Sequence, residues 1–226
     1  MTSQRPIKAV GPNTILGVVL IVYLMILLDL SIVYTGMPEI GETMGMSPVM
    51  QTWVQNAYLL FFGGFLLLSA RLGDTFGRRL ILQLGIGLFT LASLMIGISQ
   101  SQYELIAARA VQGLGASILA PSVLAVISTT FPEGSERTRA LAWYSVVAGA
   151  GSSLGMVLGG IFAGLLSWRI GFLVNIPIGF GLLYAVVRFI PESFGAVIAF
   201  YVQIIHEYRI FGRFLTTGHC RDAVQT

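Results

Sequence analysis

Charged residues are scarce in this chain of 226 residues, where Asp, Glu, Lys and Arg together make up 10%. Soluble domains carry about 25% of such residues. Apolar residues account for 55% of the sequence, and the mean hydropathy is +0.83. This composition excludes an ordinary soluble domain and predicts an integral membrane protein. The net charge of +3 does not indicate nucleic-acid binding, because most basic residues flank apolar runs, where membrane topology explains them.

Cysteine and histidine are nearly absent as well. The single cysteine, Cys220, excludes an intramolecular disulfide framework and a thiolate metal cluster. His206 and His219 have no ligand spacing around them. The sequence also has no phosphate-binding P-loop and no recognisable pairing of a nucleophile with a base. We therefore expect no metal, no cofactor and no enzymatic activity.

Long apolar runs dominate the sequence, and each is close to or above the roughly 20 residues that cross a bilayer as a helix. They predict an all-α, multipass membrane protein with six spans. The expected spans are Thr14–Met37, Gln51–Ala70, Leu80–Ser99, Tyr103–Phe131, Arg139–Leu166 and Arg169–Ile190. The first run is long for a signal-peptide core, so we interpret it as a retained helix. Glu104 has capping-box spacing from Ser101, which predicts a cap for the fourth helix.

Basic residues set the expected orientation in the membrane. Those on one side of the six spans are Arg5, Lys8, Arg71, Arg78, Arg79, Arg137, Arg139 and Arg188, whereas only Arg169 falls in an opposite loop. Cytoplasmic loops carry the excess of Lys and Arg. We therefore expect residues 1–13 to form a cytoplasmic segment and the protein to lie in the cell membrane.

Ionisable residues also occur within or beside the apolar runs, where they are costly and usually functional. Asp29 lies inside the first helix, where it could load and release a proton as water access changes. Arg109 lies in the fourth helix, and Gln112 shares its face at i+3. Structural alternatives stay open for both charges: a carboxylate satisfied by neighbouring hydroxyls or a helix end, and an arginine that locks helix packing. The sequence alone does not show whether Asp29 and Arg109 meet.

Two glycine patterns complete the candidate sites. A compact cluster, with Gly73, Asp74, Gly77, Arg78 and Arg79, fills the expected short loop between the second and third helices. It is either an ordinary positive flank or a gating loop in which the two glycines let the chain turn. In the fifth helix, a stripe of small residues allows close helix contact, either as a motif or as generic packing. Gly151, Gly155 and Gly159 form that stripe, and Gly160 extends a neighbouring strip of the same packing motif.

Five segments in order resemble motifs of the major facilitator superfamily, specifically its fourteen-helix branch of multidrug proton antiporters. They are LLDLSIVYTGMPEI (Leu27–Ile40), LLLSARLGDTFGRR (Leu66–Arg79), LIAARAVQGLGAS (Leu105–Ser117), GSSLGMVLGG (Gly151–Gly160) and SWRIGFLVNIPIG (Ser167–Gly179). The resemblance covers roughly residues 14–192. The chain departs from the family patterns at Ala70, at Tyr34 and at Met156, where glycine, asparagine and proline are usual.

The resemblance implies a six-helix bundle equivalent to the N-terminal half of such a transporter, spanning residues 14–192. It also implies roles: Asp29 in proton coupling or cation recognition, Arg109 as its electrostatic modulator, and the Asp74–Arg79 loop as a conformational latch. The inherited function would be proton-coupled export of hydrophobic or cationic compounds by alternating access. The expected partners are a small lipophilic or cationic substrate, protons and membrane lipid, with no nucleic acid.

Half a transporter leaves two alternatives for function. The chain either transports by forming a homodimer or pairing with another half, or it is a non-transporting membrane fragment that binds or interferes with a full-length transporter. A sugar or metabolite facilitator fits the first-helix and fifth-helix motifs less well. Residues 193–226 form a divergent tail, expected to be interfacial or poorly ordered, and we interpret them as sequence from a truncation or frameshift.

Overall fold

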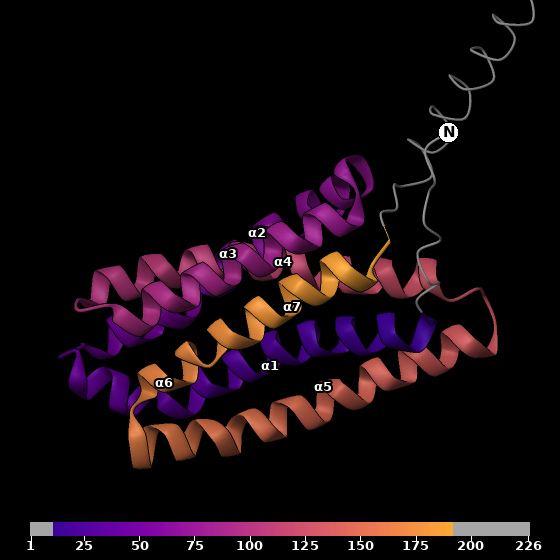
Figure 1. The fold of residues 1–226 in the computed structure, drawn as a ribbon. Helices are drawn as coiled ribbons and strands as arrows, with labels where there is room; N and C mark the ends of the chain where they lie inside the picture. Colours follow the sequence, from indigo (N-terminus) through magenta and orange to yellow (C-terminus); the bar gives the residue numbers. More distant parts are fainter. Residues whose placement is uncertain (1–10, 192–226) are drawn as a thin grey trace, which may run out of the picture.

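The computed structural model describes residues 11–191, and within that range the chain is helical and has no β-strand (Figure 1). The helices are α1 (Pro12–Thr43), α2 (Pro48–Phe76), α3 (Arg78–Ile98), α4 (Gln102–Thr130), α5 (Ser135–Ile161), α6 (Trp168–Leu173) and α7 (Asn175–Phe189). A short π-helix, η1 (Phe162–Leu166), links α5 to α6. The expected tail 193–226 lies outside the described residues, as does most of the expected segment 1–13.

The described helices form six segments long and apolar enough to cross a membrane. α5 and η1 make one segment (Ser135–Leu166), and α6 and α7 make another (Trp168–Phe189). The predicted all-α, six-span class is thereby confirmed. Two helices run well past their expected ends: α1 continues through Pro38 to Thr43 although we expected Met37, and α2 continues to Phe76 although we expected Ala70. A proline removes one backbone hydrogen bond but does not always end a helix in a membrane, where neighbouring groups satisfy the freed carbonyl.

Local sequence explains several helix ends. Pro48 occupies the first turn of α2, where its missing N–H costs nothing, and the Ser47 hydroxyl accepts a hydrogen bond from the Met50 N–H. At α4 the Ser101 hydroxyl accepts from the Glu104 N–H, while the Glu104 carboxylate accepts from the Ser101 N–H. This reciprocal capping box confirms the cap predicted for Glu104.

The helices are arranged as an elongated bundle in which α1 lies beside α5, and α4 lies between α2 and α3 (Figure 1). Over an apolar stretch of 18 residues in α3 and in α4, 56% of the residues are buried, whereas the share is 11% in α2 and 17% in the α5–η1 segment. α3 and α4 are therefore central, whereas α2 and α5 are peripheral and present most of their surface outward.

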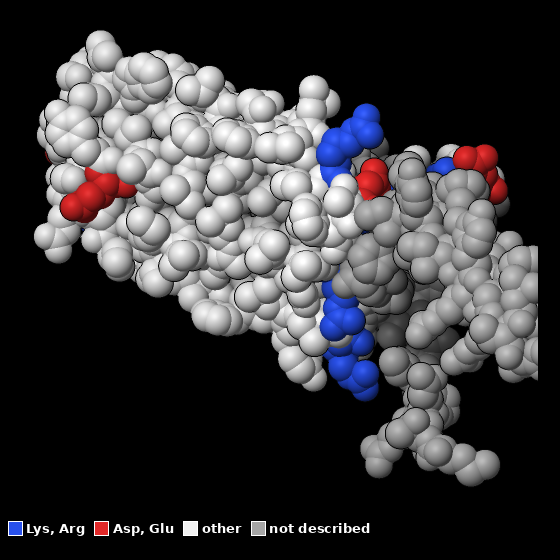
Figure 2. Space-filling model, turned by 90° about the horizontal axis from the view of Figure 1, so that it is seen from above, with Lys and Arg blue, Asp and Glu red and all other residues white. Residues whose placement is uncertain are grey.

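Charge is distributed along the long axis of the bundle. The turn between α2 and α3, the loop between α4 and α5, and the end of α7 lie at the same end as the start of α1 (Figure 1). Figure 2 shows Lys and Arg gathered in a band toward that end, and a long white surface separates this band from acidic residues at the opposite end. This is the pattern of a membrane-spanning body with one basic rim.

Candidate functional site

Asp29 and Arg109 meet in the middle of the bundle. Asp29 lies on α1 and is 1% exposed, and Arg109 lies on α4 and is 0% exposed. Arg109 Nη1 donates a hydrogen bond to Asp29 Oδ2 over 2.7 Å, forming an ion pair between two fully buried side chains. The structure therefore joins the two charged residues whose relation the sequence left open.

Gln112 completes the contact from the next turn of α4. Its Nε2 donates to the second oxygen of Asp29, Oδ1, over 2.7 Å, and to the Ser93 hydroxyl of α3 over 2.8 Å. Its Oε1 accepts a hydrogen bond from Arg109 Nη1. Gln112 thus shares the face of Arg109, as expected for residues three apart on a helix, and holds the carboxylate from the other side.

Asn175 and Ser93 belong to the same cluster, although sequence reasoning did not select them. Asn175 Nδ2 lies 3.2 Å from Asp29 Oδ1 and 3.3 Å from the Ser93 hydroxyl, so it donates toward both. Asn175 is the first residue of α7, directly after the break at Val174 between α6 and α7. An amide inside an expected membrane span was the available signal, because such side chains usually hydrogen-bond across helices.

Tyr58 and Val54 bring α2 to the same cluster. The Arg109 guanidinium lies over the Tyr58 ring, 4.2 Å from its centroid, and Arg109 Nε donates to the Val54 carbonyl over 3.4 Å. α2 can approach α4 this closely because α4 has a glycine, Gly113, at the contact. A Cβ at that position would lie 2.3 Å from the Tyr58 carbonyl oxygen. At this contact two buried donors, Arg109 Nη2 and the Tyr58 hydroxyl, have no hydrogen-bond partner among the described residues.

We call Asp29, Ser93, Arg109, Gln112 and Asn175 the polar cluster. It draws one or more side chains from α1, α3, α4 and α7 into an interior that is otherwise apolar. A buried ion pair repays its desolvation only when further hydrogen bonds satisfy the remaining lone pairs, and both carboxylate oxygens of Asp29 are satisfied here. A proton arriving on Asp29 would cancel one charge of the pair, so the cluster can couple protonation to helix contacts.

The glycine-spaced cluster between α2 and α3 differs from the expected loop. Gly73 lies within α2, and the whole turn is made by Gly77, whose φ of +99° favours glycine. Arg78 Nη2 pairs with Asp74 Oδ1 at 3.0 Å, and its Nη1 donates to the Ala125 carbonyl on α4 over 3.1 Å. Arg79 Nη2 donates to the Val187 carbonyl on α7 over 2.8 Å. The two arginines therefore tie the α2–α3 turn to the ends of neighbouring helices.

The three stripe glycines form the contact between α5 and α1. A Cβ added to Gly155 would lie 2.5 Å from the Ser31 Cβ, and one added to Gly159 would lie 2.8 Å from the Ile32 Cα. Gly151 faces α1 in the same way. Gly160 is different, because a Cβ there would meet no atom within 4 Å. Gly160, which we expected on a neighbouring strip of the motif, therefore does not share the close α1–α5 contact.

Curated relatives match most of this chain but only part of their own length. The cephamycin export protein CmcT of Amycolatopsis lactamdurans is 40% identical over 184 residues, which cover 81% of this chain and 38% of that protein. The puromycin resistance protein pur8 of Streptomyces alboniger is 42% identical over 163 residues, covering 72% of this chain and 32% of that protein. The chain thus spans about a third of the length of these relatives.

Solved structures share the fold at low sequence identity. The peptide transporter POT in complex with sulfate aligns with a TM-score of 0.68 at 16% identity, covering 96% of this chain and 47% of that chain. A bacterial homologue of the human lysosomal transporter Spinster, inward-facing and unoccupied, aligns with a TM-score of 0.66 at 18% identity, covering 85% and 46%. The six-helix bundle of the described residues therefore has the fold of nearly half of each transporter.

The family model described as Major Facilitator Superfamily matches residues 19–203. That range includes all five motif segments and every residue of the polar cluster. With the ordered motifs, the six-span fold and this match in agreement, the chain belongs to the Major Facilitator Superfamily.

Proposed function

We propose that this chain supplies the N-terminal half of a proton-coupled exporter of hydrophobic or cationic compounds. The observation that carries the proposal is the buried Asp29–Arg109 ion pair, held by Gln112 between α1 and α4. Ionisable side chains at membrane depth mark ion or substrate paths by default. Two of the relatives are named a cephamycin export protein and a puromycin resistance protein, and these names support a drug-like substrate class.

The proposed coupling begins at Asp29. With the carboxylate ionised, Arg109 Nη1 and Gln112 Nε2 hold its two oxygens, and this ties α1 to α4. A proton bound at Oδ2 would convert the ion pair into a charged arginine facing a neutral acid, which weakens the attraction. α1 could then move relative to α4, and release of the proton to the other side would restore the pair. Asp29 is the proton or cation site in this scheme, and Arg109 is its electrostatic modulator.

The α2–α3 turn is the proposed gating element of the same half. Arg78 joins the start of α3 to α4, and Arg79 joins it to α7, both through charge-assisted hydrogen bonds to backbone carbonyls. Asp74 remains exposed beside Arg78, so its carboxylate is available to a further helix end. The positions of these side chains fit a latch that favours one access state.

The proposed location is the cell membrane, with the N-terminus in the cytoplasm. Six of the arginines in the described residues lie at the end where α1 begins, namely Arg71, Arg78, Arg79, Arg137, Arg139 and Arg188, whereas Arg169 lies at the opposite end. The positive-inside rule then puts the α1 start on the cytoplasmic side.

Transport also needs a partner for the outward faces of α2 and α5, which are the least buried spans. The two halves of these transporters are related by an axis along the membrane normal, so a second copy of the chain could sit in parallel. A homodimer and pairing with another transporter half are both compatible with this geometry. The competing proposal is a non-transporting fragment that binds a full-length relative through the same faces.

Proteoliposome efflux tests these proposals. The full chain is reconstituted, a fluorescent lipophilic cation is loaded, and efflux is followed after a proton gradient is imposed. Gradient-driven efflux that is lost in Asp29→Asn would support proton-coupled transport through Asp29. Absence of efflux from folded, correctly inserted protein would reject transport by this chain alone. In that case, co-reconstitution with a full-length relative that exports the dye would show whether the chain interferes.

A further inference from the structure

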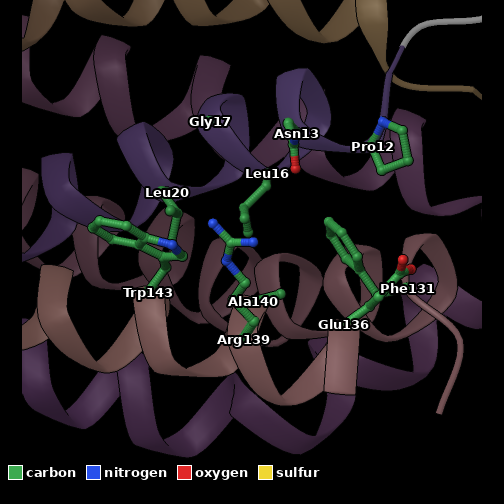
Figure 3. Close-up of a pocket in the computed structure, with 10 residues that line it drawn as sticks. All are labelled: Pro12, Asn13, Leu16, Gly17, Leu20, Phe131, Glu136, Arg139, Ala140 and Trp143. Atoms are coloured by element: carbon green, nitrogen blue, oxygen red, sulfur yellow. The ribbon is translucent and has the colours of Figure 1, made fainter. Parts of the chain in front are cut away.

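A cleft separates α1 from α5 at the end where both helices begin (Figure 3). Its volume is about 520 Å³, and its walls combine the first turns of the two helices with Phe131 at the end of α4. The interior is mainly apolar, with Leu16, Leu20 and Trp143, while Asn13, Glu136 and Arg139 supply polar groups. The cleft is separate from the polar cluster, and none of its residues has a role in the proposed transport scheme.

The cleft exists because α1 and α5 are in close contact over only part of their length. From Gly151 onward, α5 presents glycines to α1, and the helices touch closely. Nearer the start of α5 the contact residues are large: the rings of Tyr23 and Tyr144 stack at a centroid distance of 4.0 Å. A stacked ring pair holds two backbones farther apart than a glycine contact does. The cleft therefore opens on the α5-start side of this ring pair.

Arg139 is the cation of the cleft. Its guanidinium group reaches toward α1 and ends near Leu16 and Trp143 (Figure 3). Within residues 11–191 it has neither an ion pair nor a side-chain hydrogen bond, even though Glu136 lies one turn away on the same helix. The neighbouring arginine, Arg137, is committed elsewhere, because it pairs with Glu133 at 3.2 Å and donates to the Phe131 carbonyl.

The cleft also lies at the depth of lipid headgroups. Its residues belong to the first turns of two membrane-spanning segments, Pro12–Thr43 and Ser135–Leu166, at the basic end of the bundle. Trp143 is half exposed, as expected for an interfacial indole. The lining carries Glu136 as well as Arg139, so the attraction for an anionic headgroup comes from the Arg139 guanidinium, which forms no ion pair with Glu136, and an acyl chain can continue along the apolar wall.

We propose that the α1–α5 cleft binds an anionic phospholipid, with the headgroup phosphate on Arg139 and an acyl chain along Leu20 and Trp143. The charge fits an anion because Arg139 lies in the cleft and forms no ion pair in the described part of the chain. The apolar wall fits a lipid better than a small soluble anion. Occupation of the cleft would connect α1 to α5 at an end where they are otherwise apart.

Native mass spectrometry of the full chain in detergent tests this site, with phosphatidylglycerol and phosphatidylcholine as probes. The unchanged chain should bind its first phosphatidylglycerol molecule more tightly than any further phosphatidylglycerol molecules, and more tightly than it binds phosphatidylcholine. Arg139→Gln should weaken that first binding step by about fivefold, the worth of one basic residue near a lipid surface. Arg139→Lys should retain most of the preference, because it keeps the charge.

Arg71→Gln is the matched control, because Arg71 is an exposed arginine at the same end of the bundle but outside the cleft. It should leave the first binding step unchanged. Equal weakening by Arg71→Gln and Arg139→Gln would overturn the proposal in favour of diffuse surface attraction. Displacement of the lipid by soluble glycerol 3-phosphate at comparable concentration would also overturn it, because the cleft would then be a site for small anions.

Discussion

Arg109 Nη1 donates a 2.7 Å hydrogen bond to Asp29 Oδ2, across 80 positions of sequence and between two side chains that solvent does not reach. Because both side chains are buried, the charge of each one is the main compensation for the desolvation cost of the other. Gln112 bridges the pair by donating to Asp29 and accepting from Arg109. The consequence is an energetic coupling between α1 and α4 that substitutions can measure.

The first prediction concerns this coupling. Asp29→Asn should destabilise the folded chain by about 3–5 kcal/mol, because it leaves the Arg109 charge buried without its counterion. The double variant Asp29→Asn, Arg109→Gln should cost less than Arg109→Gln and Asp29→Asn summed. Unfolding in mixed micelles, followed by circular dichroism, measures all three. Strict additivity would show that the two side chains do not interact in the folded protein.

The second prediction concerns Asn175, which donates to Asp29 and to Ser93. Asn175→Ala removes both bonds and leaves a buried carboxylate oxygen with one donor fewer, so we expect a loss of about 1–3 kcal/mol. Asn56→Ala is the control, because Asn56 is an exposed amide on α2. It should change the unfolding free energy by less than about 0.5 kcal/mol. If both substitutions changed the unfolding free energy equally, the hydrogen bonds of Asn175 would not stabilise the polar cluster.

Much of this arrangement could be predicted from sequence, and its limits have physical reasons. The six spans follow from the length of the apolar runs, since a bilayer demands about 20 such residues in a helix. Asp29 and Arg109 stand out because charge is costly at membrane depth. Their contact could not be predicted, because lipid-facing and core-facing positions are both apolar and periodicity therefore does not show which face of α1 meets α4.

Asn175, Gly73 and Gly160 show the same limit at single residues. Asn175 is neutral and sits inside a segment that reads as one continuous apolar run, so nothing marked the break at Val174 that aims it inward. The spacing of the glycines predicts a loop position for Gly73 and a place in the helix-five packing motif for Gly160. Glycine indicates that close approach or a turn is allowed, but the neighbouring helices decide which glycine is used.

The third prediction uses the adjacent glycines of α5. Gly159→Ala would put a Cβ 2.8 Å from the Ile32 Cα and still closer to the Thr35 hydroxyl, so α1 and α5 must separate. We expect a cost of about 1–3 kcal/mol, typical of overpacking. Gly160→Ala meets no atom within 4 Å and should be neutral or stabilising by up to about 1 kcal/mol through helix propensity. The reverse order of stabilities would contradict the α1–α5 contact.

The fourth prediction concerns the turn between α2 and α3, where Gly77 alone reverses the chain at a φ of +99° and a ψ of 132°. Gly77→Ala places a side chain in a backbone region that costs of order 1–3 kcal/mol for residues other than glycine. The strain should also shift Arg78 away from the Ala125 carbonyl, because Arg78 begins α3 directly after the turn.

Gly73→Ala is the control, since Gly73 is helical and a Cβ there meets no atom within 4 Å. Hydrogen exchange of the α2 end and the α3 start should rise in Gly77→Ala and stay unchanged in Gly73→Ala. Equal exchange in the two variants would mean that the turn tolerates a side chain and that Gly77 does not set the position of Arg78.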